Sequence, residues 1–203
     1  IRQGSYRNYE IIIIENNSKS EEIFDYYKEL QMQYPDIRLV EWKPEIPGTF
    51  NYSAINNYGA SYAKGEYLLF LNNDIEIITK DYMERMLTLC GKENTGAVGA
   101  KLYYPDDTIQ HAGIVIGIGG HARGIAANMC VGQVRSDSGY MYRASLRQNL
   151  SAATAAFLMV PAMVFHGVDG FCEALSVAFN DVDLCLKTVS YTHLRAHETP
   201  EHL

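Results

Sequence analysis

The segment most informative about the architecture is Tyr67-Leu68-Leu69-Phe70-Leu71-Asn72-Asn73-Asp74. Its apolar run is typical of a strand buried on both faces. The run ends abruptly in two amides and a carboxylate, and in open α/β sheets ligands bind beyond the carboxyl ends of the strands. Oxygen ligands of this kind suit a hard divalent cation, which can in turn hold phosphate. On strand context alone, a plain polar turn explains the Asn-Asn-Asp sequence equally well.

The size and charge of the chain limit the functions open to it. With 203 residues, 47% of them hydrophobic, it can bury one sizeable core, so we expect a single domain. It carries 17 basic and 24 acidic residues, a net charge of −7, which argues against nonspecific nucleic-acid binding. The cysteines are widely spaced and form no Cys-x-x-Cys pair, so we expect buried free thiols.

Strand and helix patterns alternate through the first half of the chain. Two β-α-β units in succession predict parallel strands joined by right-handed crossovers. We therefore expect an α/β, Rossmann-like fold with a mostly parallel central sheet flanked by helices. The predicted strands are Tyr9–Glu15, Ile37–Trp42, Tyr67–Leu71, Gly96–Tyr104 and Ser151–Val160, and the predicted helices are Glu21–Gln33, Phe50–Ala63, Asp81–Cys90 and Asp181–Lys187. The segment Gly124–Leu150 lacks periodicity and is predicted to be a long, mobile loop.

Three polar clusters follow apolar runs, and they are Glu15-Asn16-Asn17-Ser18, Asn72-Asn73-Asp74 and Asn180-Asp181-Val182-Asp183. Because the first two end parallel strands of the predicted sheet, we expect them to face one ligand at the same edge. The first could read a base or a ribose, and Asp74 could share a cation with a diphosphate. Asp181, at a helix start, could be a general base, although a carboxylate favoured by the helix dipole is the alternative. The combination fits transfer of a group from a nucleoside diphosphate.

Taken together and in this order, the motifs resemble the inverting glycosyltransferases of family 2, which have the GT-A fold. The matching blocks are Tyr9–Ser18, Phe50–Gly59 followed by Ala63–Tyr67, and Leu71–Asp74 at the position of the family's DxD motif. Gln110–Gly113, Val168–Phe171 and Phe179–Leu186 are similar to a bacterial polysaccharide subgroup that is rhamnosyltransferase-like. The resemblance covers nearly everything from Tyr6 to Lys187.

The resemblance implies a role for each matching residue. Asp74 would hold Mn²⁺ or Mg²⁺ on the donor diphosphate, with the neutral Asn72 where the family often has an Asp. Asp181 would be the catalytic base that deprotonates the acceptor hydroxyl. The residues expected to bind the donor are Glu15, Asn16, Asn17, Asn57, Asn72 and Asn73. His111 is interpreted as a hydrogen-bonded structural histidine, with a role near the acceptor left open.

The implied function is transfer of a sugar from a nucleoside-diphosphate sugar to a hydroxyl of a glycan or lipid-linked acceptor, in cell-surface polysaccharide synthesis. We expect no nucleic-acid partner and a cytoplasmic location, with peripheral association at the inner face of the plasma membrane. The alternative is a noncatalytic nucleotide-sugar-binding or scaffold module. A nucleotidylyltransferase is a third possibility, but the glycine-rich, basic phosphate loop of that class is not seen near the start of the sequence.

Both ends of the sequence are unusual. The family's first strand would precede Ile1, so we expect an incomplete sheet, and a chain that is inactive or nearly so and prone to aggregate. Residues 189–203 lack apolar periodicity and resemble a translated adaptor or vector sequence. We therefore expect a partial catalytic domain over residues 1–188 and a non-native tail over residues 189–203.

Overall fold

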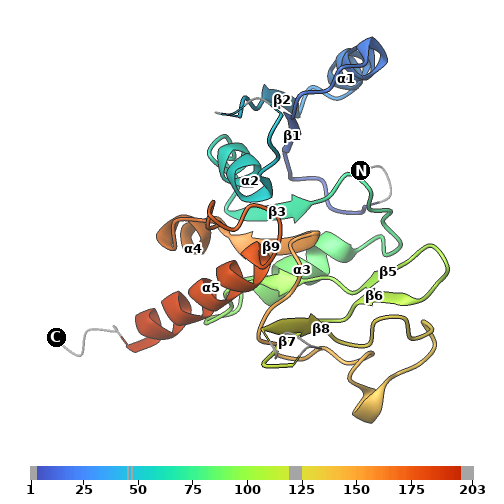
Figure 1. Cartoon of the computed structure of the whole chain (residues 1–203), viewed down its shortest axis with the longest axis vertical. Coiled ribbons are helices and arrows are strands. Elements are labelled where there is room, and N and C mark those ends of the chain that lie inside the picture. Colours follow the sequence, from blue (N-terminus) through green and yellow to red (C-terminus); the bar gives the residue numbers. More distant parts are fainter. Residues whose placement is uncertain (1–3, 45, 47, 119–124, 198–203) are drawn as a thin grey trace.

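The computed structural model describes residues 4–44, 46, 48–118 and 125–197, with side chains as far as residue 192. Its helices and strands mix along the chain, as the α/β class requires (Figure 1). The strands are β1 (Ile11–Glu15), β2 (Ile37–Glu41), β3 (Tyr67–Leu71), β4 (Val98–Gly99), β5 (Leu102–Tyr103), β6 (Ile109–His111), β7 (Ile114–Ile116), β8 (Ala126–Asn128) and β9 (Phe157–Pro161). The helices are α1 (Glu21–Gln33), α2 (Tyr52–Ala60), α3 (Tyr82–Cys90), α4 (Ala162–Gly167) and α5 (Asn180–His197), with a short 3₁₀ helix η1 (Tyr140–Tyr142).

The centre of the molecule is an antiparallel sheet in which β9 lies between β3 and β4. Alternate residues of β9 point to opposite faces of this sheet. Leu158 packs in one apolar cluster with Leu184 of α5, and Met159 packs in a second cluster with Met86 of α3. Because both faces of β9 are covered by helices, its whole apolar run is buried.

The α/β class is confirmed, but a mostly parallel central sheet is not observed. Parallel pairing among the described residues is confined to β1 and β2, where Ile11 lies beside Ile37, and the other paired strands are antiparallel. The reason is the placement of β9. This late strand inserts beside β3 in the opposite direction, and the local alternation of strands and helices contains no information about such a distant partner.

Two segments differ from the predicted elements in ways that matter for function. Of the predicted strand Ser151–Val160, only the part from Phe157 onward is a strand, and Ala152–Ala156 forms an irregular segment before it. The predicted loop Gly124–Leu150 contains β8 and η1 within its described part. All four cysteines are free as expected, although only Cys90 and Cys185 are buried.

Helix α5 continues past residue 188 into the predicted tail. Thr188 is buried on this helix. The ring of Tyr191 lies against Gly167, where an added Cβ would come within 2.6 Å of it. Residues 198–203 lie outside the described part of the chain. The domain boundary at residue 188 stays a prediction.

Because Leu158 is fully buried in the central strand, Leu158→Ala should lower the free energy of unfolding by about 2–5 kcal/mol. The matched control is Ile78→Ala, since Ile78 is exposed and its truncation should change stability by no more than about 0.5 kcal/mol. Urea denaturation measures both values. Equal losses in the two variants would contradict the placement of β9 at the centre of the core.

Candidate active site

The segment Ala152–Ala156, which leads into β9, joins the parts of the candidate site. The backbone N–H of Ala155 donates a hydrogen bond to Oδ2 of Asp181, at 3.3 Å. The carbonyl oxygen of Ala155 accepts a hydrogen bond from the hydroxyl of Tyr52, at 2.9 Å. Because both side chains bind the same residue, the start of α2 and the start of α5 are held together beside the end of the central sheet.

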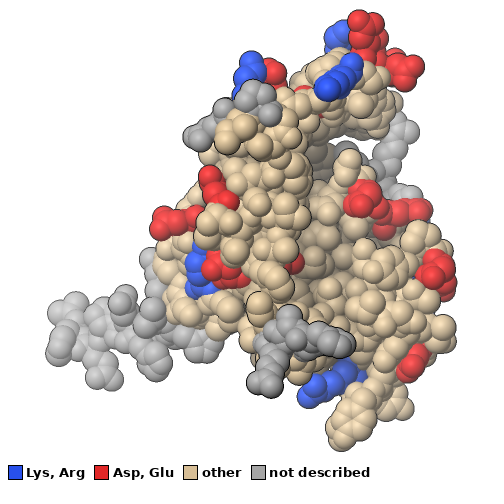
Figure 2. Space-filling view, in the orientation of Figure 1, with Lys and Arg blue, Asp and Glu red and all other residues tan. Residues whose placement is uncertain are grey.

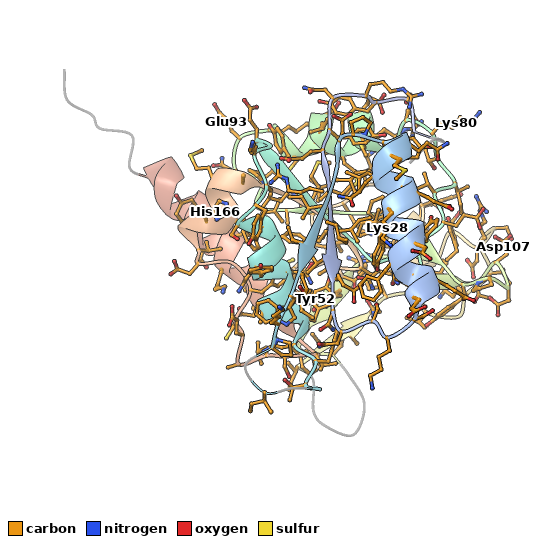
Figure 3. All side chains as sticks on the ribbon, turned by 90° about the horizontal axis from the view of Figure 1, so that it is seen from above. Lys28, Tyr52, Lys80, Glu93, Asp107 and His166 are labelled. Atoms are coloured by element: carbon orange, nitrogen blue, oxygen red, sulfur yellow. The ribbon has the colours of Figure 1, made fainter. Side chains whose placement is uncertain are left out.

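Tyr52 connects Asp181 with the motif at the end of β3. Its hydroxyl oxygen lies 3.4 Å from Oδ1 of Asn72, and the backbone N–H of Asn72 donates to the carbonyl of Ala156 at 3.0 Å. Burial raises the pKa of Tyr52, and the negative charge of Asp181 raises it further, so the phenol stays protonated. Figure 3 shows Tyr52 at the start of α2. Sequence reasoning missed this residue, although it lies within the Phe50–Gly59 block that carries the family resemblance.

The carboxylate of Asp181 is half-buried at the start of α5. Its Oδ1 accepts a hydrogen bond from the backbone N–H of Val182 at 2.8 Å, so the residue does stabilise the helix start. Its other oxygen, Oδ2, is the one directed at Ala155. The side chain of Asp181 therefore stabilises the start of α5 and also faces the junction with Tyr52. Its role as a base stays a prediction.

Asp74 and Asn73 are exposed in the turn after β3. Within the described parts of the chain, no three His, Cys, Asp or Glu side chains converge to form a metal site. Mg²⁺ often needs only one or two protein carboxylates, because substrate phosphates and water complete its shell. The chemistry of these residues fits a cation of that kind, for which Asp74 would be the charged ligand and Asn72 a neutral neighbour. It does not fit a fully protein-caged metal.

Glu15 shapes the turn after β1. Its Oε1 accepts the backbone N–H of Ser18 at 2.5 Å, and its Oε2 accepts the hydroxyl of the same residue at 2.9 Å. Burial would raise the pKa of Glu15, but the hydrogen bonds from Ser18 and Tyr27 lower it overall. Both carboxylate oxygens are thus used within the protein, while Asn16 is half-buried and Asn17 exposed at the turn.

The expectation that the first two polar clusters share one sheet edge is wrong. β1 belongs to the parallel pair with β2, whereas β3 belongs to the antiparallel sheet with β9. The two strands therefore do not end along one ladder of hydrogen bonds. Contact of Asn16 and Asn17 with the same ligand as Asp74 stays a prediction that depends on how the pair and the sheet lie beside each other.

Asn57, predicted to bind the donor, uses its amide inside the protein. Its Oδ1 accepts the backbone N–H of Phe171 and its Nδ2 donates to the carbonyl of Phe171, both at 2.9 Å. Nδ2 also lies 3.0 Å from Oε1 of Glu173. A Cβ at Gly170, where φ is +62°, would come within 2.6 Å of Oδ1 of Asn57, so this close pairing requires glycine there. The geometry gives Asn57 a positioning role, and donor contact stays a prediction.

The start of α2 also fixes the path of the chain into α5. The hydroxyl of Ser53 donates to the carbonyl of Leu175 at 2.6 Å. The backbone N–H of Tyr52 donates to the carbonyl of Ser176 at 2.7 Å. These bonds fasten the loop that precedes Asp181, so the direction of its carboxylate depends on α2 as well as on α5.

His111, at the end of β6, has a partner for each ring nitrogen. Its Nε2 accepts the backbone N–H of Thr154 at 3.3 Å, and its Nδ1 lies 2.6 Å from Oδ1 of Asn128 in β8. These partners fit a neutral ring with the proton on Nδ1. Burial lowers the pKa of His111, and the bond to Asn128 and the charge of Asp181 offset this only in part. The predicted hydrogen bonding of His111 is confirmed, and a role near the acceptor stays a prediction.

Comparison with known proteins identifies the family. The model of glycosyl transferase family 2 matches residues 1–151. The chain belongs to glycosyl transferase family 2. It is 40% identical over 183 residues to the uncharacterized protein y4gI of Sinorhizobium fredii (strain NBRC 101917 / NGR234), covering 90% of this chain and 19% of that protein. It is 35% identical over 187 residues to the O-antigen biosynthesis protein RfbC of Myxococcus xanthus, covering 92% of this chain and 14% of that protein.

This family 2 chain thus spans less than a fifth of the length of these curated relatives. The family model ends at residue 151, before the segment Ala152–Ala156 and before Asp181. Among the described residues, no helix has the length and apolar character needed to cross a membrane.

Removing the side chain of Asn57 tests its positioning role. Asn57→Ala leaves the N–H and carbonyl of Phe171 without their partners, so it should lower the free energy of unfolding by about 1–3 kcal/mol. Asn73→Ala, at an exposed asparagine, should leave stability within about 0.5 kcal/mol. Chemical denaturation measures both. If Asn57→Ala instead binds nucleotide more weakly while its stability is unchanged, Asn57 is a ligand of the donor and has no positioning role.

The lowered pKa of His111 predicts how stability depends on pH. The folded chain favours the neutral ring, whereas the unfolded chain takes up a proton below about pH 6.5. Stability contributed by this residue is therefore present above that pH and is lost as the pH falls below it. Denaturation between pH 5 and 7 should show that the free energy of unfolding falls less steeply with decreasing pH in His111→Gln than in the natural chain. Equal slopes in the natural chain and in His111→Gln would refute this account.

Proposed function

We propose that the chain is the catalytic part of an inverting glycosyltransferase that moves a sugar from a nucleoside-diphosphate sugar to a hydroxyl of a glycan or lipid-linked acceptor. The observation that carries the proposal is the junction at Ala155, where Tyr52 contacts Asn72 on one side and Asp181 binds on the other. The junction brings the proposed leaving-group side and the proposed base together. The printed name of the Myxococcus xanthus relative supports a role in cell-surface polysaccharide synthesis.

In the proposed reaction Asp181 takes the proton from the acceptor hydroxyl. The oxygen then attacks the anomeric carbon on the face opposite the diphosphate, and the bond between that carbon and the diphosphate oxygen breaks. One displacement by an external hydroxyl inverts the configuration, as it does in inverting hydrolysis. General base assistance of this kind contributes roughly 10²–10⁴-fold to the rate. The hydroxyl of Tyr52 is directed to the carbonyl of Ala155, so Tyr52 holds the junction and does not compete for the proton.

The diphosphate gains negative charge as it leaves. A bound Mn²⁺ or Mg²⁺ supplies electrostatic stabilisation of that charge. Asp74 would hold this cation, with the amide oxygen of Asn72 beside it. Asn16, Asn17 and Asn73 would bind the donor through amides that both donate and accept hydrogen bonds. Glu15 and Asn57 would act indirectly, because their polar atoms hold the turn after β1 and the loop before α5.

The alternative function is a noncatalytic nucleotide-sugar-binding or scaffold module with the same core. It needs the donor side of the site but no base, so in that module the carboxylate of Asp181 would serve only to hold the start of α5 and the N–H of Ala155. We favour the enzyme because Asp181 and Asn72 meet there through Tyr52. The cytoplasmic location, at the inner face of the plasma membrane, stays part of the proposal.

Asp181→Asn tests the base directly. The amide keeps an oxygen that can accept the N–H of Ala155 but cannot take a proton, so transfer should fall at least ~10²-fold while donor binding persists. Release of nucleoside diphosphate from a panel of donors measures transfer, in a chain extended at both ends with its flanking native residues. Asp183→Asn is the control, because Asp183 pairs with Lys187 at 3.0 Å, and it should retain transfer.

Two outcomes of this assay would decide against the proposal. Full turnover in Asp181→Asn would remove the base assignment. Tight donor binding by the extended natural chain without any release of nucleoside diphosphate, across donors and acceptors, would favour the noncatalytic module.

A further inference from the structure

One protrusion of the molecule presents apolar side chains to solvent. Tyr140 is 80% exposed, Met141 72%, Tyr142 65% and Leu146 64%. We call these four residues the apolar tip. In Figure 1 the segment that contains them projects at the lower end of the molecule, at the opposite end from α1. Large apolar side chains gathered on a surface in this way mark a site of interaction.

The protein holds the apolar tip in place. Ala144, in its middle, is buried. The carbonyl of Ala144 accepts a hydrogen bond from Nζ of Lys101 at 2.6 Å, and its N–H donates to the carbonyl of Ser138 at 2.9 Å. Met141 and Tyr142 have φ of +52° and +60°, a left-handed conformation that bulky residues rarely adopt. A conformation of this kind persists where surrounding contacts fix it, often at functional surfaces.

The charge beside the apolar tip is opposite to that of the whole chain. Arg143 and Arg147 are exposed there, and the segment Gly139–Leu150 contains no Asp or Glu, although Asp137 just before it accepts the N–H of Gly139 at 2.8 Å. The chain as a whole has a net charge of −7. Figure 2 shows basic side chains at the lower end of this face, beside the protrusion. An anionic surface would therefore attract this end while repelling much of the remainder.

We propose that the apolar tip, with Arg143 and Arg147, docks the chain on the surface of an anionic lipid bilayer. Tyrosine rings sit well at a bilayer boundary, since the ring is apolar and the hydroxyl polar. Met141 and Leu146 supply apolar groups that insert between lipids, and the two guanidinium groups bind lipid phosphates. A protrusion cannot enclose a small ligand, and a second copy of the chain would need a matching groove for it. A bilayer needs neither.

The apolar tip is connected along the chain to the candidate site. The chain runs from the apolar tip through Leu150, which packs against Gly113, directly into Ala152–Ala156. That segment binds Asp181 through Ala155. This deepens the proposed function by giving a lipid-linked acceptor a route to the site, but the docking itself does not depend on sugar transfer.

The test is sedimentation of the chain with vesicles of phosphatidylethanolamine and phosphatidylglycerol, compared with vesicles of phosphatidylcholine alone. We expect binding to the anionic vesicles that weakens strongly in about 0.5 M salt, because screening acts on the arginines. The combined variant Tyr140→Ser, Met141→Ser, Tyr142→Ser should bind at least tenfold more weakly. Each of Arg143→Gln and Arg147→Gln should weaken binding about fivefold.

The matched control is Tyr26→Ser with Met32→Ser on α1, where the two side chains are 57% and 84% exposed. This variant removes similar apolar surface from the opposite end and should bind vesicles as the natural chain does. Circular dichroism checks that every variant keeps its helices.

Equal binding to neutral and anionic vesicles, or unchanged binding in the tip variants, would overturn the proposal. So would tip-dependent dimerisation without vesicle binding. A chain that binds vesicles but transfers no sugar would contradict only the proposed function, and the docking proposal would stand.

Discussion

The N–H and the carbonyl of Ala155 are bound by two side chains, Asp181 and Tyr52, and the candidate site depends on these two bonds. A buried backbone group without a partner costs about 1–3 kcal/mol, so each side chain contributes to the stability of the core that it helps to close. The same bonds set the direction of the Asp181 carboxylate and of the Tyr52 hydroxyl. The two bonds to Ala155 therefore determine both the stability of this region and the orientation of the side chains in the site.

This interaction is supported from both sides. On one side, β9 pairs with β3, and the ladder continues to the N–H of Asn72, which donates to Ala156. On the other side, Ser53 and Asn57 of α2 hold the loop that precedes α5. A change in either support would turn Asp181 relative to Asn72 without altering either residue. Residues remote from a donor or acceptor are therefore as necessary for the geometry of this site as its proposed ligands.

Sequence patterns predicted the bounds of those strands and helices that depend mainly on residues close together in the chain. The strand Tyr67–Leu71 and the helix Glu21–Gln33 have the predicted bounds, since their apolar patterns and chain-breaking residues lie within or beside each segment. The antiparallel insertion of β9 could not be predicted, because it depends on partners far away in sequence. The function of Asn57 was hidden for the same reason, since Phe171 is 114 residues away from it. Ala152–Ala156 has the composition of a buried strand, but side chains from other elements bind its backbone.

Charge gives a physical reason for a cation in the proposed reaction. The chain has a net charge of −7, and the proposed metal ligand Asp74 and the proposed base Asp181 are both carboxylates. A diphosphate approaching these groups is repelled unless positive charge comes with it, and the repulsion grows as the leaving group gains charge. Lys187, on α5, is already engaged with Asp183 and with the carbonyl of Gly170. A divalent cation bound to the donor would satisfy Asp74, neutralise the diphosphate and leave Asp181 free to act as a base. If Asp74 holds the cation and Asp181 takes the proton, both carboxylates are compatible with a negatively charged substrate.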